Sequence, residues 1–494
     1  MRVTTALFAT MTLTLSVVLA APTVHAQAPP TKPLPEIPLS LDEVLAWVDR
    51  AHPLLKSAGT DKIVARGRLL KALSSFEPAL VNDTELERFI SSSNPQKGTQ
   101  TGGFNDTFID FRHPSGIKAI AGYRHSIGDA VIPDLRLGGN NQQLLVGASI
   151  PLLRGLLINP ESAELQRSEF ADPRADIKVA ETRQGLFLAA ATQLWDWVSA
   201  AKFVDVATRA QAVAEDRMKQ IEQRAKAGAV APLDVVEANQ EVQRRKESAI
   251  TAQRLLEQEQ FKMSLFLWER DEPVRPSPAR VPDFPALQAS PAPEDVHTHK
   301  LRARTDRPEI REIDIEAKIN NIDLQLAKNN LLPSLDADAT PARSPEKFVL
   351  GLGYKFGLEL RVPLMQRRGR GEMLEAQGKA DRLVLTQKYR EQQVVVDVDN
   401  ALSAIERAKE RIAAAADSLR LAHTLEEGER FRFSLGATSV LFVNLRERNA
   451  VDSEVQLIRA KADYQKALAN YQWAIGAWAK SVGMAVPVNY APIR

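Results

Sequence analysis

The chain of 494 residues contains no cysteine. This absence excludes disulfide bonds, thiolate metal sites, cysteine nucleophiles and a lipid anchor on a cysteine at the mature N-terminus. Aromatic residues make up only 6 % of the sequence, and 64 Lys and Arg nearly balance 62 Asp and Glu. A nucleic-acid-binding protein usually has a concentrated basic face. The balance therefore gives no support to nucleic acid as a partner.

Long hydrophobic runs are missing after the first residues. Arg2, the apolar stretch "ALFATMTLTLSVVLAA" and the small-x-small sequence "VHA" predict a signal peptide over residues 1–26. No later segment offers eighteen consecutive apolar residues, so no helix of the mature chain is expected to span a bilayer. An exported bacterial-type chain of this kind is periplasmic, released, or inserted in the outer membrane as a β-barrel.

Four short sequence segments, each centred on a proline or glycine that we call a landmark, occur twice in the same order. The two copies lie 255 residues apart for the first two landmarks, 212 for the third and 208 for the fourth. We therefore expect a tandem duplication, with structural repeats over 40–270 and 296–482. The landmark pairs are Pro53 and Pro308, Pro78 and Pro333, Pro151 and Pro363, and Gly228 and Gly436.

Irregular segments separate and flank the two repeats. Residues 27–39 and 271–295 are rich in proline, which predicts an extended N-terminal segment and an extended linker. Residues 483–494 are expected to form a C-terminal tail. The first repeat is 43 residues longer between its second and third landmarks. We expect this polar insertion, within 81–115, to be a surface loop.

Residues 348–364 alternate between apolar and mostly polar or glycine positions over seventeen residues. A strand with one apolar face, long enough to cross a bilayer obliquely, is typical of outer-membrane barrels. The alternative is a strand of a soluble sandwich. The residues expected to face lipid are Phe348, Leu350, Leu352, Tyr354, Phe356, Leu358, Leu360 and Val362.

Weaker alternation elsewhere predicts one strand pair in each repeat, at about 115–152 and about 334–364. Four strands per chain are too few to close a barrel, because about eight are needed merely to enclose side chains. Open sheet edges are not tolerated in lipid. Several chains are therefore expected to share one barrel.

Long helical segments follow each strand pair. The 77 residues from Pro151 to Gly228 and the 73 from Pro363 to Gly436 are rich in alanine and charged residues. A continuous helix of this size would be roughly 110 Å long. The phrases "GAVAPLDVVEAN" and "GATSVLFVNLRERN" begin at these glycines and predict the tips of two helical hairpins, since glycine suits the left-handed position that ends a helix.

The doubled landmarks, the stretch "LELRVPL" and the doubled tip phrase together resemble the TolC-like outer-membrane efflux family, over about 40–482. The resemblance implies a mixed α and β fold and a homotrimer. Each chain would contribute four strands to a twelve-strand barrel in outer-membrane lipid, and this barrel would continue as a long periplasmic α-helical barrel. It implies the outer membrane of a Gram-negative-type cell as the location. It also implies a passive duct that has no enzymatic activity and no cofactor. The duct would belong to a tripartite efflux or secretion system, together with a periplasmic adaptor (membrane fusion) protein and an inner-membrane pump.

The resemblance also assigns roles by position. Tip residues of the family contact the adaptor; here they are Ala227, Gly228, Ala229, Leu435, Gly436 and Ala437. The best-known members place entrance aspartates six and nine residues after the second tip glycine, where this chain has Phe442 and Leu445. Only Asp234, in the first repeat, keeps an acid at the matching place. The possible periplasmic entrance residues are Asp234, Phe442, Asn444, Leu445 and Arg446.

Alternatives remain at this stage. Residues 446–448, Arg-Glu-Arg, also fit a solvated helix face. Long helices alone would fit a periplasmic coiled-coil scaffold, although a soluble scaffold has no reason to carry the alternation at 348–364. His297 and His299 have no third metal ligand nearby, and Trp195 and Trp197 are expected to be packing residues. No catalytic constellation is found, and the cargo stays open between drugs, metal ions, lipidic metabolites and proteins.

Overall fold

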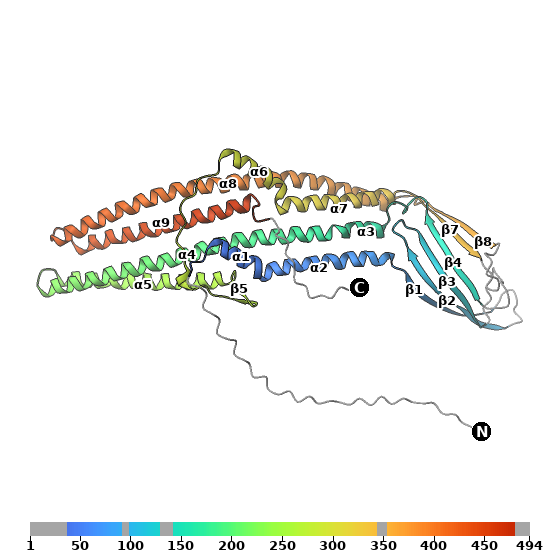
Figure 1. Cartoon of the computed structure of the whole chain (residues 1–494), viewed down its shortest axis with the longest axis horizontal. Coiled ribbons are helices and arrows are strands. Elements are labelled where there is room, and N and C mark those ends of the chain that lie inside the picture. The colour runs from blue at the N-terminus through green and yellow to red at the C-terminus, as the bar shows by residue number, and fades with distance from the viewer. Residues whose placement is uncertain (1–36, 91–97, 129–141, 343–352, 480–494) are drawn as a thin grey trace, which may run out of the picture. The chain divides into compact units, whose positions relative to one another are not determined.

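The computed structural model describes residues 37–90, 98–128, 142–342 and 353–479. From Pro38 onward these residues form one unit, in which long helices lie side by side and a sheet continues from one end of them (Figure 1). The expected mixed α and β fold class, mostly helical, is confirmed. The expected signal peptide, the C-terminal tail and most of segment 27–39 lie outside the described residues.

The first half of the chain supplies two short helices, then strands, then a long hairpin of helices. Helix α1 begins after Ser40, whose hydroxyl accepts a hydrogen bond from the backbone N–H of Glu43. Such a cap satisfies one of the N–H groups that every helix start leaves free. The helices are α1 (Leu41–Ala51), α2 (Pro53–Leu73), α3 (Pro160–Glu169), α4 (Ala171–Lys226) and α5 (Pro232–Ser264).

The second half repeats this order of elements. It begins after a linker that contains the small hairpin β5 (Trp268–Glu269) and β6 (Glu272–Pro273). Helix α8 runs for 68 residues without a break and is about 100 Å long. The helices are α6 (Pro293–Asp306), α7 (Pro308–Asn330), α8 (Arg367–Ser434) and α9 (Val440–Ala474).

The described strands form one antiparallel sheet of six strands, in the order β1-β2-β3-β4-β7-β8. The expectation of four strands per chain is therefore wrong. Strands β3 and β4, and β7 and β8, occupy the two expected strand ranges, but β1 and β2 occupy the segment that we expected to be a surface loop. The strands are β1 (Ala79–Ile90), β2 (Thr99–Arg112), β3 (Lys118–Gly128), β4 (Gln142–Pro151), β7 (Ser334–Ala342) and β8 (Gly353–Arg361).

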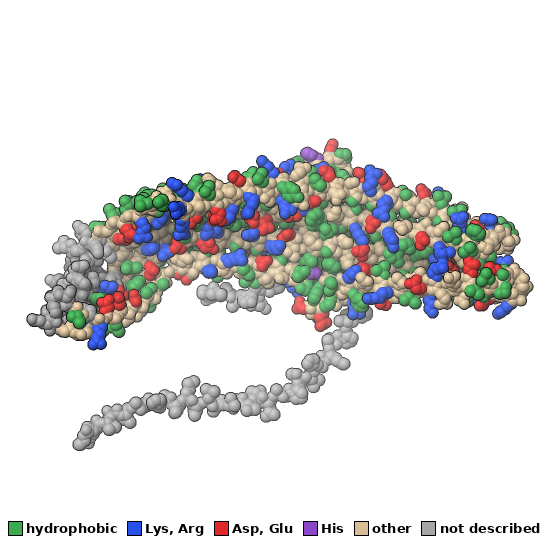
Figure 2. Space-filling model, turned by 180° about the vertical axis from the view of Figure 1, so that it is seen from behind, with side chains coloured by type: hydrophobic (Ala, Val, Ile, Leu, Met, Phe, Trp, Pro, Cys, Tyr) green, Lys and Arg blue, Asp and Glu red, His purple; other side chains and the backbone are tan. Residues whose placement is uncertain are grey.

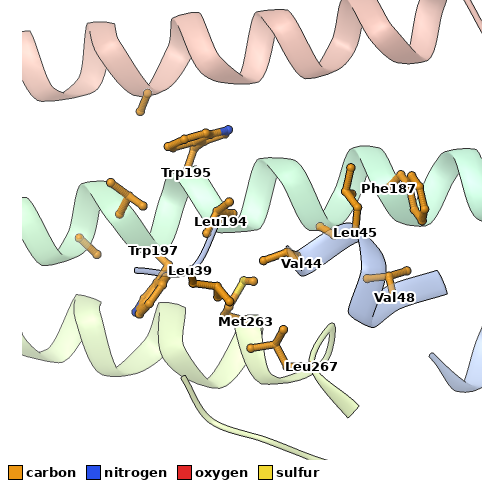
Figure 3. Close-up of a cluster of buried hydrophobic side chains, with 14 of the residues drawn as sticks. Leu39, Val44, Leu45, Val48, Phe187, Leu194, Trp195, Trp197, Met263 and Leu267 are labelled. Atoms are coloured by element: carbon orange, nitrogen blue, oxygen red, sulfur yellow. The ribbon is translucent and has the colours of Figure 1, made fainter. Parts of the chain in front are cut away.

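The largest hydrophobic cluster lies where α1, α4 and α5 meet (Figure 3). Trp197 of α4 is fully buried and lies beside Leu39 and Met263. Trp195 stacks on Phe284 of the linker, with ring centroids 5.9 Å apart. Both tryptophans are therefore packing residues, as expected. A second cluster joins α8 and α9 through side chains such as those of Ile405 and Tyr464.

The proline-rich linker packs against helices of both halves. Its Arg280 forms an ion pair with Glu43 of α1 at 2.8 Å, and the backbone N–H of Leu39 donates to the Arg280 carbonyl. Further along, the backbone N–H of Gln288 donates to the Tyr464 hydroxyl of α9 at 2.9 Å. The linker is thus extended but fixed. Across the described residues, no helix is both long and apolar enough to cross a bilayer.

Candidate functional site

The turn between α4 and α5 lies at the end of the helices far from the sheet (Figure 1). Ala227 ends α4, and Gly228 follows with φ +73°, in the left-handed region. The backbone N–H of Ala229 donates to the Arg224 carbonyl at 2.8 Å, which closes the last helical turn. Asp234 accepts a hydrogen bond from the backbone N–H of Ala231 at 3.1 Å and so caps the start of α5.

The turn between α8 and α9 has nearly the same geometry. Leu435 ends α8, Gly436 has φ +72°, and the N–H of Ala437 donates to the Arg432 carbonyl at 2.9 Å. A Cβ built at Gly228 or Gly436 meets no atom within 4 Å. Both turns therefore lie in open space. Their flanks expose large apolar side chains: Leu233, Val236, Phe431, Leu435, Leu441, Phe442 and Leu445.

The entrance residues expected from the sequence fall into two groups. Phe442 and Leu445 are exposed, Arg446 is half-buried, and Asp234 is the helix cap described above. Asn444 is different, because it is only 3 % exposed and accepts a hydrogen bond from Arg217 of α4 at 2.9 Å. Glu447 is also buried, so the interpretation of residues 446–448 as a wholly solvated face is wrong.

Behind the tips lies a buried network of charged side chains from α4, α8 and α9. Arg217 forms an ion pair with Glu447, and both side chains are almost completely buried. Arg430 lies 2.7 Å from Glu447 and 2.7 Å from Glu426. Burial, with a smaller contribution from the neighbouring Arg430 charge, lowers the pKa of Arg217 to about 10. The guanidinium stays charged at neutral pH, and Glu447 compensates it.

Sequence reasoning missed Arg217, Glu426 and Arg430. Charged residues on long helices are usually solvated, and Arg217 lies far from Glu447 in the sequence. A charged network that joins two helical hairpins fixes their relative position, since separating them would leave buried charges without partners. On the face of the helices that Figure 2 shows, acidic and basic side chains are interspersed.

The sheet has one apolar and one polar face over β7 and β8. Phe356 and Leu358 are 73 % and 74 % exposed, and they lie opposite Ala339 and Ala337. Leu360 and Val362 are exposed on the same side. The expected lipid-facing residues Phe348, Leu350 and Leu352 lie outside the described residues, and Tyr354 lies in β8.

The opposite face carries charged side chains. On β7 and β8 it presents Asp336, Asp338, Gly357 and Glu359, which pair across the two strands. On β2 and β3, Arg124 donates two hydrogen bonds to Asp106, at 2.7 and 2.6 Å. An apolar outside and a polar inside are typical of a barrel that encloses an aqueous lumen.

Comparison with known proteins supports this arrangement. Residues 302–477 match the family model described as outer membrane efflux protein. The resemblance to the outer membrane efflux family is confirmed. The match supports an outer-membrane channel role for this chain, and the periplasmic scaffold is not favoured. No curated protein matched the chain.

Solved outer-membrane channels share the efflux-protein fold over most of this chain. The Campylobacter jejuni CmeC outer membrane channel is 13 % identical with a TM-score of 0.65, and the match covers 88 % of this chain and 85 % of that one. The open state of the Neisseria gonorrhoeae MtrE outer membrane channel is 15 % identical, with a TM-score of 0.62 and coverage of 89 % and 89 %. The outer membrane protein VceC from Vibrio cholerae is 12 % identical with a TM-score of 0.63, and the match covers 88 % of this chain and 96 % of that one.

The efflux family is a family of channels and not of enzymes. Among the described residues, no group of three or more His, Asp or Glu side chains is arranged to hold a metal ion. His299 instead lies 2.8 Å from the Tyr471 hydroxyl, between α6 and α9. This contact gives His299 a structural role in helix packing.

Proposed function

We propose that three copies of this chain form a passive duct through the outer membrane and periplasm of a Gram-negative-type cell. The duct receives cargo from an inner-membrane pump through a periplasmic adaptor protein. The apolar outer face of β7 and β8 supports contact with lipid, because Phe356, Leu358 and Leu360 are large apolar side chains that lie exposed on one face of β8. The proposed structural repeats are 40–270 and 296–482, and no cysteine-linked lipid is involved.

The two open glycine turns carry the proposal that the tips dock onto the adaptor. Both turns protrude, both have room for a side chain, and both are flanked by exposed apolar residues such as Leu233 and Leu441. Exposed apolar clusters of this kind mark interaction surfaces. The docking residues are Ala227, Gly228 and Ala229 in one tip and Leu435, Gly436 and Ala437 in the other. Phe442, Leu445 and Arg446, whose side chains are not buried, remain the proposed entrance residues.

Bulky substitutions at the tips test the proposal. Any side chain at Gly228 or Gly436 has a strain cost of about 1 kcal/mol, because φ is positive there. Gly436→Ala is the matched control, since it introduces the same strain without bulk. We expect Gly436→Trp and Gly228→Trp to leave the trimer intact and to abolish efflux and crosslinking to the adaptor, whereas the alanine variants keep both. Normal efflux with both tips carrying tryptophan would show that the turns are not the docking surface.

A further inference from the structure

Strand β3 has a neighbour on each side. It pairs with β4 on one edge and, from Lys118 to Gly128, with β2 on the other. Strand β1 in turn pairs with β2 from Ala79 to Ile90. The free edges of the described sheet therefore belong to β1 and β8. A barrel with four strands from each chain would need the edge of β3 that β2 already occupies.

The hairpin of β1 and β2 is held firmly at its helical end. The turn between β2 and β3 lies against the start of α3, where Asn159 donates a side-chain hydrogen bond to the Pro114 carbonyl at 2.9 Å. Arg112, at the end of β2, forms an ion pair with Glu161 of α3. A Cβ at Gly116 would lie 2.5 Å from the Gly155 carbonyl oxygen, so the turn is in tight contact with the segment before α3.

The strands themselves are also in close contact. A Cβ at Gly122 of β3 would overlap the backbone of Thr107 and Phe108 in β2. A Cβ at Gly103 of β2 would overlap the backbone of Glu85 in β1. By contrast, a Cβ at Gly357 of β8 would meet only Asp338 at ordinary contact distance. These glycines allow close approach of β1, β2 and β3, so the extra hairpin is an integral part of the sheet.

Between apolar residues such as Leu80 and Leu86, the outward face of the hairpin carries polar side chains that bond one another. Asn82 donates to the Thr107 hydroxyl at 2.7 Å, and Asn105 donates to the Thr84 hydroxyl at 2.6 Å. The two amides also bond each other, at 3.3 and 3.2 Å. Polar groups in the hydrocarbon region must find partners within the protein. These four side chains, which we call the Asn–Thr ladder, provide such partners.

We propose that β1 of each chain pairs with β8 of the next chain, so that three chains close an eighteen-stranded barrel. The inference rests on the proposed trimeric duct. Strand β1 leaves α2 and β8 enters α8, so the two strands run in opposite directions relative to the helices and suit antiparallel pairing. Pairing them removes every open edge, as lipid requires.

The consequence is a wider exit. Barrel diameter grows roughly in proportion to strand number, so eighteen strands give about one and a half times the diameter of twelve. Barrels of sixteen to eighteen strands are wide enough to enclose an aqueous channel. The barrel of this chain therefore fits cargo of larger cross-section than a duct of four strands per chain would pass.

Because the chain lacks cysteine, disulfide crosslinking can identify the paired edge directly. Leu80 of β1 and Ala121 of β3 lie on the outward face, as does Leu360 of β8. One set of variants combines Leu80→Cys with cysteine at Phe356, Leu358 or Leu360 in turn. The matched set replaces Leu80→Cys with Ala121→Cys. We expect covalent dimers and trimers in outer membranes from the first set and none from the second.

A deletion of residues 79–117 supplies an independent measurement. It joins Pro78 to β3 as Pro333 is joined to β7, so the first half then resembles the second. We expect electron microscopy of the parent trimer to count eighteen strands, in a barrel about one and a half times as wide as that of the deletion variant. Crosslinking through Ala121, or twelve strands in the parent barrel, would overturn the eighteen-strand barrel alone. Absence of a parent trimer from the outer membrane would instead overturn the proposed duct.

Discussion

The two halves of the chain share one order of elements and differ at both ends. In the sheet of the described residues, the first half has four strands where the second has two. At the tips, Asp234 caps the returning helix of the first half, whereas Asn444 and Glu447 of the second half enter a buried charged network. The framework of long helices is thus common to both halves. The two ends differ: the first half adds strands β1 and β2 to the sheet, and the second half contributes Asn444 and Glu447 to buried polar contacts between the helical hairpins.

The largest expected loss of stability comes from breaking the buried ion pair between Glu447 and Arg217. Glu447→Ala leaves Arg217 buried without its carboxylate, and breaking a buried pair costs about 3–5 kcal/mol. Glu429 in α8 is the comparison, because its ion-pair partner, Arg432, lies within one turn of the same helix and is exposed, so water can solvate Arg432 when the carboxylate is removed. We expect Glu429→Ala to cost less than Glu447→Ala. Urea denaturation of the assembled trimer measures both, and equal losses would show that the buried pair between the two hairpins adds no stability of its own.

The next prediction compares the two faces of β8. Phe356→Arg places a charge on the apolar outward face, at a cost of about 2–4 kcal/mol near the middle of the membrane. Gly357→Arg is the control, because its side chain would point to the opposite face, beside Asp338. We expect a clear loss of heat-resistant trimer in the outer membrane for Phe356→Arg only. Similar losses for both would show that the faces are assigned wrongly.

The Asn–Thr ladder is a polar group on the outward face of β1 and β2, which also carries Leu80 and Ile109, whereas the outward face of β7 and β8 is apolar. Asn105→Ala removes the amide that donates to the Asn82 side-chain oxygen and to the Thr84 hydroxyl, and leaving such groups without that donor costs about 1–3 kcal/mol. Replacing both residues, as Asn82→Leu with Asn105→Leu, removes both amides, leaves only the hydroxyls of Thr84 and Thr107, and should restore part of the loss. Thermal dissociation of the trimer measures the three proteins. If the trimer of the double variant dissociates at a lower temperature than the trimer of Asn105→Ala, the assignment of the ladder to the lipid-facing side is wrong.

The smallest effect compares the starts of α2 and α7. His52 accepts a hydrogen bond from the backbone N–H of Leu54 through Nδ1, whereas Arg307, before α7, makes no such cap. Burial lowers the pKa of His52 below 6.5. The unfolded chain therefore binds a proton more readily than the folded one, and stability falls as pH drops below about 6.5.

His52→Asn keeps a capping side chain without a titrating group, whereas His52→Ala loses the cap at about 1 kcal/mol. Unfolding midpoints at about pH 7.5 and 5.5 should therefore differ more for the parent than for His52→Asn. An unchanged difference in the asparagine variant would assign the pH dependence to other groups.

The sequence predicted the elements whose patterns are regular. Alternation over 348–364 identified β8, and the doubled glycine phrases identified the two helical turns. Strands β1 and β2 were missed because polar residues interrupt the apolar positions on both of their faces. Asn82 and Thr84 break the outward apolar row that contains Leu80 and Leu86, and Asp83 and Glu85 point inward, so the apolar period is weak. Polar side chains can form a strand here because they bond across the hairpin, and such pairing is visible only in three dimensions.

The junction between β4 and β7 has a consequence for how the chain folds. It pairs Ala148 with Ala339 and Pro151 with Asp336, residues about 190 positions apart in the sequence. Strands β1 to β4 can form locally as a meander soon after they are exported. Contacts across such a long stretch of chain are slow to form, so β4 would expose an unpaired edge until the second half arrives. An exposed strand edge promotes aggregation, so the late pairing of β4 with β7 is the step at which the folding chain is most exposed to it.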